Sequence, residues 1–125
     1  MDTADGRPAI GRRGEDAALD RYLRDGYRLV ARNWRCGLGE IDLILARGHL
    51  LVVCEVKTRR GSSLGGPYES VTARKQLKLR RLAQAFVSSE PRALAGAGVR
   101  DVRFDVASVT VGPAGAEVHV FEDAF

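Results

Sequence analysis

Three acidic residues and one lysine lie in otherwise apolar segments of this 125-residue chain and could form a metal site. Glu40 and Asp42 occur in one β-rich run, and Glu55 and Lys57 occur in the next. Carboxylates in buried strands are costly unless a partner compensates their charge. Hard divalent cations take oxygen ligands, so a metal ion is one such partner. The first hypothesis is therefore a Mg²⁺ or Mn²⁺ site built from an Asp and a Glu-x-Lys segment, with Glu40 as a supporting residue.

These residue types suit the hydrolysis of a phosphodiester, because a carboxylate-held metal supplies both a hydroxide nucleophile and positive charge. Asp42 and Glu55 are the expected ligands, with the backbone carbonyl of Val56 as a third oxygen. Lys57 lies about 7 Å from Glu55 on the same strand face and is expected to hold or deprotonate a water. The competing interpretation is a pair of structural salt bridges from the acids to Lys57 and Arg59. The acids that precede Glu-x-Lys across a hairpin favour the functional interpretation.

The site depends on the register of that hairpin. Strands are expected over Glu40–Ala46 and Leu50–Thr58, with a break at residues 47–49. A loop of two or four residues places Asp42 on the same face as Glu55, whereas a three-residue loop places it on the other face. The hypothesis therefore requires an even loop or a β-bulge.

A first helix, expected over Ile10–Arg24, carries another acid. Glu15 shares the apolar face of this helix with Ala18 and Tyr22. This placement predicts that Glu15 points to the metal site, as an added ligand or as a residue that positions water. The alternative is a Glu in the first turn that interacts with the helix dipole, and the sequence favours neither.

A second helix, expected from about Val71 to Ser89 with Ser70 or Thr72 as N-cap, directs cations toward the same site. Lys75 extends the core stripe one turn before Leu79, with Gln76 beside it as a supporting residue. Other cations form a ridge next to the stripe, and Arg80 is expected to be solvated. The residues expected to contact phosphates are Arg59, Arg74, Lys75, Lys78 and Arg81.

Composition narrows the class of protein. Hydrophobic residues make up 45% of the chain and charged residues 29%, which indicates a folded core. The net charge is +4, and segment 57–81 is strongly basic. Charge alone favours a solvated basic surface, but the segment begins at the acidic cluster, which suggests a polyanionic partner bound beside a metal site. No apolar run approaches the ~20 residues of a membrane helix, and no signal peptide is recognised, so a cytoplasmic protein without a membrane partner is expected.

Other cofactors are not predicted. The two Cys and two His lack zinc-ligand spacing, and Cys54 is expected to be a small core residue. The loop at residues 61–67 lacks the Gly-Lys-Ser/Thr of a P-loop, and Gly96-Ala97-Gly98 is too short for a dinucleotide fingerprint. No nucleotide cofactor is therefore expected.

The elements that must position these residues form one unit in this interpretation. Residues 1–8 are expected to be flexible, and residues 9–125 to form a single domain. Further strands are expected over Tyr27–Trp34, Val102–Val111 and Glu117–Phe121, with loops at residues 61–67 and 93–98. The order α-β-β-β-α-β-β predicts a mixed α/β layer structure.

Several motifs resemble the YraN family of small bacterial proteins. They are Gly14-Glu15-Asp16-Ala17-Ala18, Arg32-Asn33-Trp34-Arg35, Gly39-Glu40-Ile41-Asp42-Leu43-Ile44, Glu55-Val56-Lys57-Thr58-Arg59, Val71-Thr72 with Lys75, Arg103-Phe104-Asp105-Val106 and Ala124-Phe125. These motifs are similar to those of the PD-(D/E)xK nucleases, especially the archaeal Holliday junction resolvases. The resemblance implies a restriction-endonuclease-like fold, with a mixed central sheet flanked by helices.

The resemblance also implies roles for single residues. Asp42 and Glu55 correspond to the metal-binding acids, and Lys57 corresponds to the catalytic lysine. Glu15 corresponds to the helix-one glutamate of the resolvases, and Lys75 to a lysine of the YraN family. Two positions depart from the pattern: Cys54 replaces a bulkier apolar residue, and Ile41 stands where the superfamily has a proline.

The combined prediction is a Mg- or Mn-dependent DNA endonuclease that acts on structured or branched DNA. Resolvase-like enzymes work as dimers so that two strands are cut together, and a homodimer is therefore expected. The superfamily also contains inactive members. The alternative is a nucleic-acid-binding module with weak or no catalysis that acts in a DNA repair or recombination complex. A third interpretation is a structural domain with an internal salt-bridge cluster.

Overall fold

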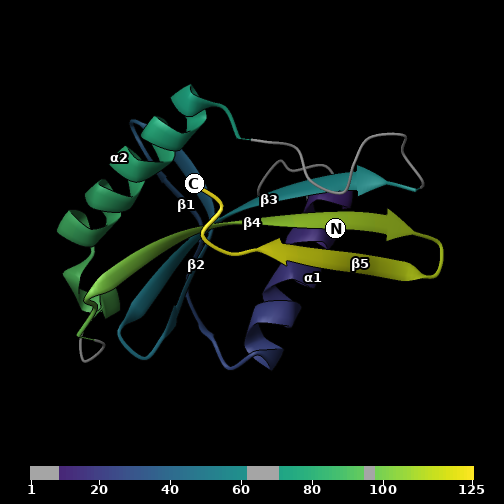
Figure 1. The fold of residues 1–125 in the computed structure, drawn as a ribbon, viewed down its shortest axis with the longest axis horizontal. Coiled ribbons are helices and arrows are strands. Elements are labelled where there is room, and N and C mark those ends of the chain that lie inside the picture. Colours follow the sequence, from purple (N-terminus) through teal and green to yellow (C-terminus); the bar gives the residue numbers. More distant parts are fainter. Residues whose placement is uncertain (1–8, 62–70, 95–97) are drawn as a thin grey trace.

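Alternating apolar patterns and two helical stripes produce seven main elements along the chain (Figure 1). The structure is a computed structural model that describes residues 9–61, 71–94 and 98–125. In order, the elements are α1 (Ala9–Arg24), β1 (Arg28–Cys36), β2 (Gly39–Arg47), β3 (Leu50–Arg60), α2 (Ala73–Ser89), β4 (Asp101–Gly112) and β5 (Gly115–Phe121). The predicted order α-β-β-β-α-β-β is confirmed.

The segments between elements account for the remaining differences from prediction. A short 3₁₀ helix, η2 (Pro91–Leu94), occupies the start of the loop that was predicted from residue 93. The predicted flexible segment 1–8 lies outside the described residues, as do residues 62–67 of the first loop and residues 95–97 of the second.

The five strands of the described residues form one mixed sheet in the order β1-β2-β3-β4-β5. The pairs β1/β2, β2/β3 and β4/β5 are antiparallel, whereas β3 and β4 are parallel and α2 lies in the connection between them. In Figure 1 α1 lies behind the sheet and α2 lies over its other face. This mixed sheet with flanking helices confirms the α/β class and is consistent with a restriction-endonuclease-like fold.

Two apolar cores form because strand side chains alternate between the faces of the sheet. On the α2 face, Leu82 and Phe86 pack with Val53 of β3. On the α1 face, Tyr22 packs with Cys54, which is fully buried as predicted. Consecutive residues of β3 thus contribute to opposite cores, which fixes the face that each following residue of β3 occupies.

The register of the β2–β3 hairpin is even. Arg47 pairs with Leu50, so the connection is the two-residue turn Gly48–His49 and not the three-residue break at 47–49. Gly48 has a φ of +59°, a left-handed conformation that glycine adopts without the usual side-chain penalty. The tight turn extends β2 to Arg47, whereas β3 extends past Thr58 because Arg59 and Arg60 pair with β4. The even loop that the hypothesis requires is therefore present.

Helix α2 begins two residues later than predicted. Thr72 is its N-cap, and the Thr72 hydroxyl oxygen accepts a hydrogen bond from the Lys75 backbone N–H at 3.2 Å. Thr72 is therefore confirmed as the N-cap, and the other candidate, Ser70, lies outside the described residues. The helix ends at Ser89, just before Pro91.

A buried polar network ties α1 to β4. The Asp105 carboxylate is fully buried and accepts a hydrogen bond from the Tyr22 hydroxyl at 2.7 Å. Arg103 donates two more hydrogen bonds to Asp105, both at 2.8 Å, and the backbone N–H of Asp123 donates a fourth at 3.1 Å. Such multiple donors compensate the burial of a charge.

Burial also controls protonation in this core. Desolvation raises the pKa of the Tyr22 phenol and the pKa of the Cys54 thiol well above their usual ranges. The hydrogen bonds that Arg103 donates to Asp105 raise the pKa of its guanidinium. Tyr22 and Cys54 therefore stay protonated in the folded protein at neutral pH.

The C-terminal residues pack against β4 and α2. Phe125 stacks on Phe104 with 5.3 Å between ring centroids, and the Arg80 guanidinium lies 4.8 Å from the Phe104 centroid. Arg80 is exposed, as predicted, and its guanidinium also lies over two aromatic rings.

Candidate active site

The Asp42 carboxylate reaches across to β3. Backbone pairing of β2 with β3 ends at Leu43 and Cys54, and the same register places Asp42 opposite Glu55. Beyond that point Asp42 Oδ2 accepts a hydrogen bond from the Val56 backbone N–H at 2.8 Å. The side chain thus takes the place of a strand partner, where the two strands begin to separate. The Asp42 carboxylate is therefore held beside the backbone of β3, the strand that carries Glu55.

Glu55 is buried on the α2 face of the sheet, with a relative exposure of 9%. Its Oε2 lies 3.4 Å from the Lys75 ammonium, which comes from the first turn of α2. The prediction that Lys75 aims into this region is therefore confirmed. The salt bridge observed for Glu55 joins it to α2, whereas the competing interpretation had paired the acids with Lys57 and Arg59. Lys57 lies two residues further along β3, on the same face as Glu55, and is half-buried.

Glu15 lies on the buried face of α1, as predicted, and is only 4% exposed. The Asn33 amide donates a hydrogen bond to Glu15 Oε1 at 3.1 Å, and Arg32 Nη2 lies 3.6 Å from the same oxygen. Helix α1 begins at Ala9, so Glu15 is beyond the first turn. The helix-dipole explanation for Glu15 is therefore wrong, and polar side chains of β1 hold its carboxylate instead.

Asn33 was not predicted as a site residue. Its φ is +52°, a left-handed conformation that is rare outside glycine and that Asn tolerates better than most residues. The register of β1 with β2 places it opposite Asp42. An Asn within a β-rich run is unusual, and that is the signal that could have identified it. Asn33 therefore links Glu15 of α1 to the position on β1 that lies opposite Asp42.

A glycine allows α1 to approach β3. A Cβ atom on Gly14 would lie 1.9 Å from the Thr58 hydroxyl oxygen and 2.7 Å from its methyl group. Only glycine fits at this contact. The close approach is next to Glu15 and sets the depth of its carboxylate in the fold.

The acids do not all converge in this conformation. Within residues 9–61, 71–94 and 98–125, no three Asp, Glu, His or Cys side chains are arranged to hold one metal ion. The structure places Asp42 opposite Glu55 and pairs Glu55 with Lys75, but Glu15 is held separately by Asn33. Two carboxylates and a backbone carbonyl still suit Mg²⁺, which keeps several waters and takes substrate oxygens.

The supporting residues have local partners. Glu40 Oε2 lies 3.1 Å from Arg35 Nε across the β1–β2 turn. The Gln76 amide donates to the Val71 carbonyl at 2.9 Å, so it stabilises the segment that enters α2. Neither contact involves Asp42 or Glu55.

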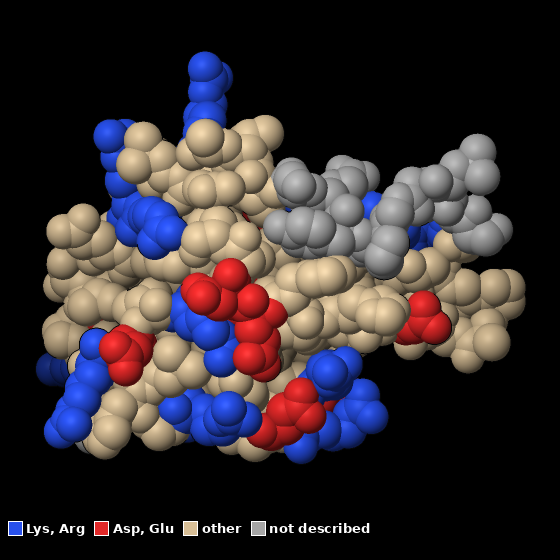
Figure 2. All heavy atoms as spheres, viewed as in Figure 1, with Lys and Arg blue, Asp and Glu red and all other residues tan. Residues whose placement is uncertain are grey.

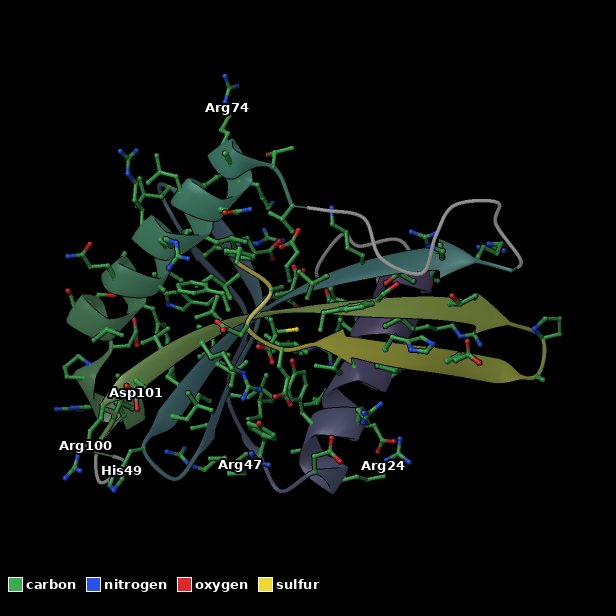
Figure 3. The ribbon with its side chains drawn as sticks, in the orientation of Figure 1. Arg24, Arg47, His49, Arg74, Arg100 and Asp101 are labelled. Atoms are coloured by element: carbon green, nitrogen blue, oxygen red, sulfur yellow. The ribbon has the colours of Figure 1, made fainter. Side chains whose placement is uncertain are left out.

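Helix α2 presents a cationic surface. Its sequence contains five Lys and Arg residues and no acid. Figure 2 shows Lys and Arg atoms, without Asp or Glu atoms, over the part of this face where α2 lies. In Figure 3 Arg74 points away from the fold at the first turn of α2. The predicted phosphate-contacting residues that are exposed on this helix are Arg74, Lys78 and Arg81.

Comparison with known proteins identifies the family of this chain. A model of the uncharacterised protein family UPF0102 matches residues 14–109. The chain belongs to this family. The UPF0102 match confirms the resemblance to the YraN family drawn from the motifs, and it spans every acid and lysine of the candidate site.

Individual UPF0102 proteins are similar over most of their length. The UPF0102 protein of Acidothermus cellulolyticus is 45% identical over 112 residues, which cover 86% of this chain and 85% of that protein. The UPF0102 protein of Moorella thermoacetica is 48% identical over 99 residues, which cover 79% of this chain and 78% of that protein. Neither helix in the described part of this UPF0102 chain is long and apolar enough to span a membrane.

Proposed function

We propose that this UPF0102 protein is a divalent-metal-dependent DNA endonuclease that acts on structured or branched DNA. The observation that carries the proposal is the 2.8 Å hydrogen bond from the Val56 N–H to Asp42. It holds the Asp42 carboxylate next to Glu55, at the end of the paired segment of two strands. Two acids on adjacent strands, with a lysine on the same strand face as Glu55, form a suitable set for phosphodiester hydrolysis.

The residues fit a hard divalent cation. Asp42, Glu55 and the Val56 carbonyl would hold Mg²⁺ or Mn²⁺, because all three offer oxygen donors. When bound, the metal would supply positive charge at the phosphate and lower the pKa of a water. The remaining coordination positions suit water and substrate oxygens, so two carboxylates and one backbone carbonyl are a sufficient contribution from the protein.

The lysines would act on the proton and the phosphate. Lys57 would accept a proton from the attacking water, since it follows Glu55 on the same strand face. Lys75 would move from Glu55 to a substrate phosphate when the Glu55 carboxylate takes a metal. The proposed role of Glu15, anchored by Asn33, is to orient a water at the edge of the site.

A cleavage screen tests this proposal. Single-stranded, duplex, flap and four-way-junction DNA would be incubated with Mg²⁺ or Mn²⁺ and with each protein variant. We expect wild-type cleavage of branched DNA that falls at least about 100-fold in Asp42→Asn and Glu55→Gln, because loss of one charged group that stabilises a transition state costs several kcal/mol. Glu117→Gln is the control, since Glu117 is exposed on β5. No cleavage by the wild type with either metal would reject the enzyme proposal.

A binding module is the second candidate, and the Lys75–Glu55 ion pair favours it. This pair compensates the buried Glu55 charge without a metal. A binding module would bind DNA with a steep salt dependence but show no cleavage and no thermal stabilisation by Mg²⁺ or Mn²⁺.

An endonuclease that cuts two strands together needs two sites, so a homodimer belongs to the enzyme proposal. Light scattering of the purified protein measures its oligomeric state.

A further inference from the structure

A hollow between the β1–β2 turn and α2 combines apolar and cationic side chains. Leu38 and Leu77 line it, and each is 51% exposed. Three cations complete its lining, namely Arg74, Lys78 and Arg81. Its volume is about 280 Å³. We call this set of five residues the leucine hollow.

The leucine hollow is a built feature, because the β1–β2 turn is packed against α2. Gly39, the first residue of β2, has a φ of +142°, and a Cβ atom there would lie 2.7 Å from Lys78 Cε and 3.6 Å from Leu82 Cδ1. Leu82 belongs to the core on this face of the sheet. The close contact holds Leu38 beside α2.

The two leucines are unusual as a pair. Single exposed leucines are common on protein surfaces, but here two from separate elements line one hollow. The hollow is bordered by cations and no acid lies on α2. This combination suits a polyanion that also carries apolar groups, and nucleic acid bases on a phosphate backbone meet that description.

The hollow is close to the candidate active site. Lys78 lies one helical turn after Lys75, which pairs with Glu55. Leu38 lies in the β1–β2 turn, four residues before Asp42, which is about 13 Å along extended chain. A DNA strand whose phosphate lies at the two acids would therefore extend over the hollow within a few nucleotides.

We infer that the leucine hollow receives an unstacked base next to a branch point in DNA, while Arg74, Lys78 and Arg81 bind the flanking phosphates. This inference rests on the proposed function and explains how branched DNA would be distinguished from duplex. Apolar side chains insert at unstacked base steps, and bases at a branch cost less to expose than paired bases. The volume lies at the lower limit for small-ligand sites, which suits one base.

A second copy of the chain is a less suitable occupant. A two-fold interface would place the three cations of one hollow close to the same cations of the other, which is repulsive. An anionic lipid surface would also attract cations and leucines. The hollow is concave and lies near the acids, so DNA is favoured, and lipid binding is one outcome of the test.

The test uses leucine variants of the full chain. Leu38→Ser, Leu77→Ser and their combination change half-exposed side chains, and thermal melts followed by circular dichroism check the fold. Leu23→Ser is the matched control, because Leu23 is 48% exposed on α1. Binding is measured by fluorescence anisotropy in EDTA, on duplex, flap and four-way-junction DNA of equal strand length. 2-Aminopurine beside the branch reports unstacking.

We expect the double variant to weaken flap and junction binding by about five- to twenty-fold, the lower part of the range for one base stacked on an aromatic ring, because leucine offers apolar contact without ring stacking. Duplex binding should change less than about twofold, and the 2-aminopurine signal at the branch should be lost. The Leu23→Ser control should match the wild type. Equal losses on all three DNAs, or no loss on any, would overturn the inference.

Two further outcomes separate this inference from the proposed function. Wild-type binding to phosphatidylserine vesicles that disappears in Leu38→Ser, without selective DNA binding, would assign the hollow to lipid and overturn the inference. Because binding is measured in EDTA, selective binding of branched DNA supports the inference even if the wild type cuts no DNA. In that case only the endonuclease proposal fails.

Discussion

The ammonium group of Lys75 lies 3.4 Å from Glu55 Oε2, so helix α2 supplies a cation to one of the two acids on the β2–β3 hairpin. In a metal-bound state the same carboxylate would have to serve a second cation. Lys75 and a metal ion are therefore expected to compete for Glu55. This competition gives the site a property that can be measured apart from catalysis.

The first prediction concerns that competition. Lys75→Met should tighten Mn²⁺ binding by up to about fivefold, because removing a neighbouring positive charge is worth up to about 1 kcal/mol at a partly exposed site. It should also lower the salt dependence of DNA binding by about one phosphate contact. Isothermal titration calorimetry with Mn²⁺ measures the first effect.

Arg74→Met is the matched control, because Arg74 lies on the same turn of α2 but points away from the fold (Figure 3). It should lower the salt dependence equally and leave Mn²⁺ affinity unchanged. Weaker Mn²⁺ binding in Lys75→Met than in the wild type would contradict the competition.

The second prediction concerns the left-handed backbone at Asn33. Asn33→Ala should be less stable than Asn33→Gly by about 1–2 kcal/mol, because both lose the hydrogen bond to Glu15 but only glycine adopts a φ of +52° without a side-chain penalty. Urea denaturation measures the difference. Equal stabilities would show that the strand relaxes to an ordinary conformation at this position.

The third prediction concerns the contact of α1 with β3. Gly14→Ala should destabilise the fold by about 1–3 kcal/mol, since the new methyl group would overlap Thr58. Adding Thr58→Ala should restore part of the loss, because the Thr58 Cβ itself would still lie 2.8 Å from the new atom. A double-mutant cycle by urea denaturation measures the coupling.

Gly11→Ala is the control for this cycle, because Gly11 is in the same helix and a Cβ there meets no atom of the described residues within 4 Å. It should stabilise the protein by about 0.5–1 kcal/mol through helix propensity. Additive effects of Gly14→Ala and Thr58→Ala would argue against the contact.

The fourth prediction concerns alkaline pH. The pKa values of Cys54 and Tyr22 are raised in the folded protein, so above the unfolded values of about 8.5 and 10 the folded state binds more protons than the unfolded chain. The free energy of unfolding should therefore fall above about pH 8.5, with about 1.4 kcal/mol lost per pH unit for each group.

Urea denaturation between about pH 7 and pH 10.5 measures this loss. Cys54→Ala should remove the Cys54 contribution, so that its decline is shallower than that of the wild type between about pH 8.5 and pH 10. Parallel curves for the two proteins in that range would rule out Cys54 as the source.

Much of the local structure was predictable, since it depends on short-range periodicity. The 3.6-residue pattern placed Glu15 on the buried face of α1 and Lys75 on the stripe of α2 that faces the sheet, and both placements are confirmed. The even register was stated as a condition but not resolved, because a break of two or three residues is equally compatible with the alternation of the strands.

The sequence by itself determined the residue types, the order of elements and the face that each helix buries, because backbone propensity and apolar periodicity are encoded locally. Tertiary structure decided the two-residue turn at Gly48–His49, the ion pair of Glu55 with Lys75 and the hold of Asn33 on Glu15. Each of these joins residues from different elements. Such contacts depend on how closely α1, α2 and the sheet can pack, and no single segment carries that information.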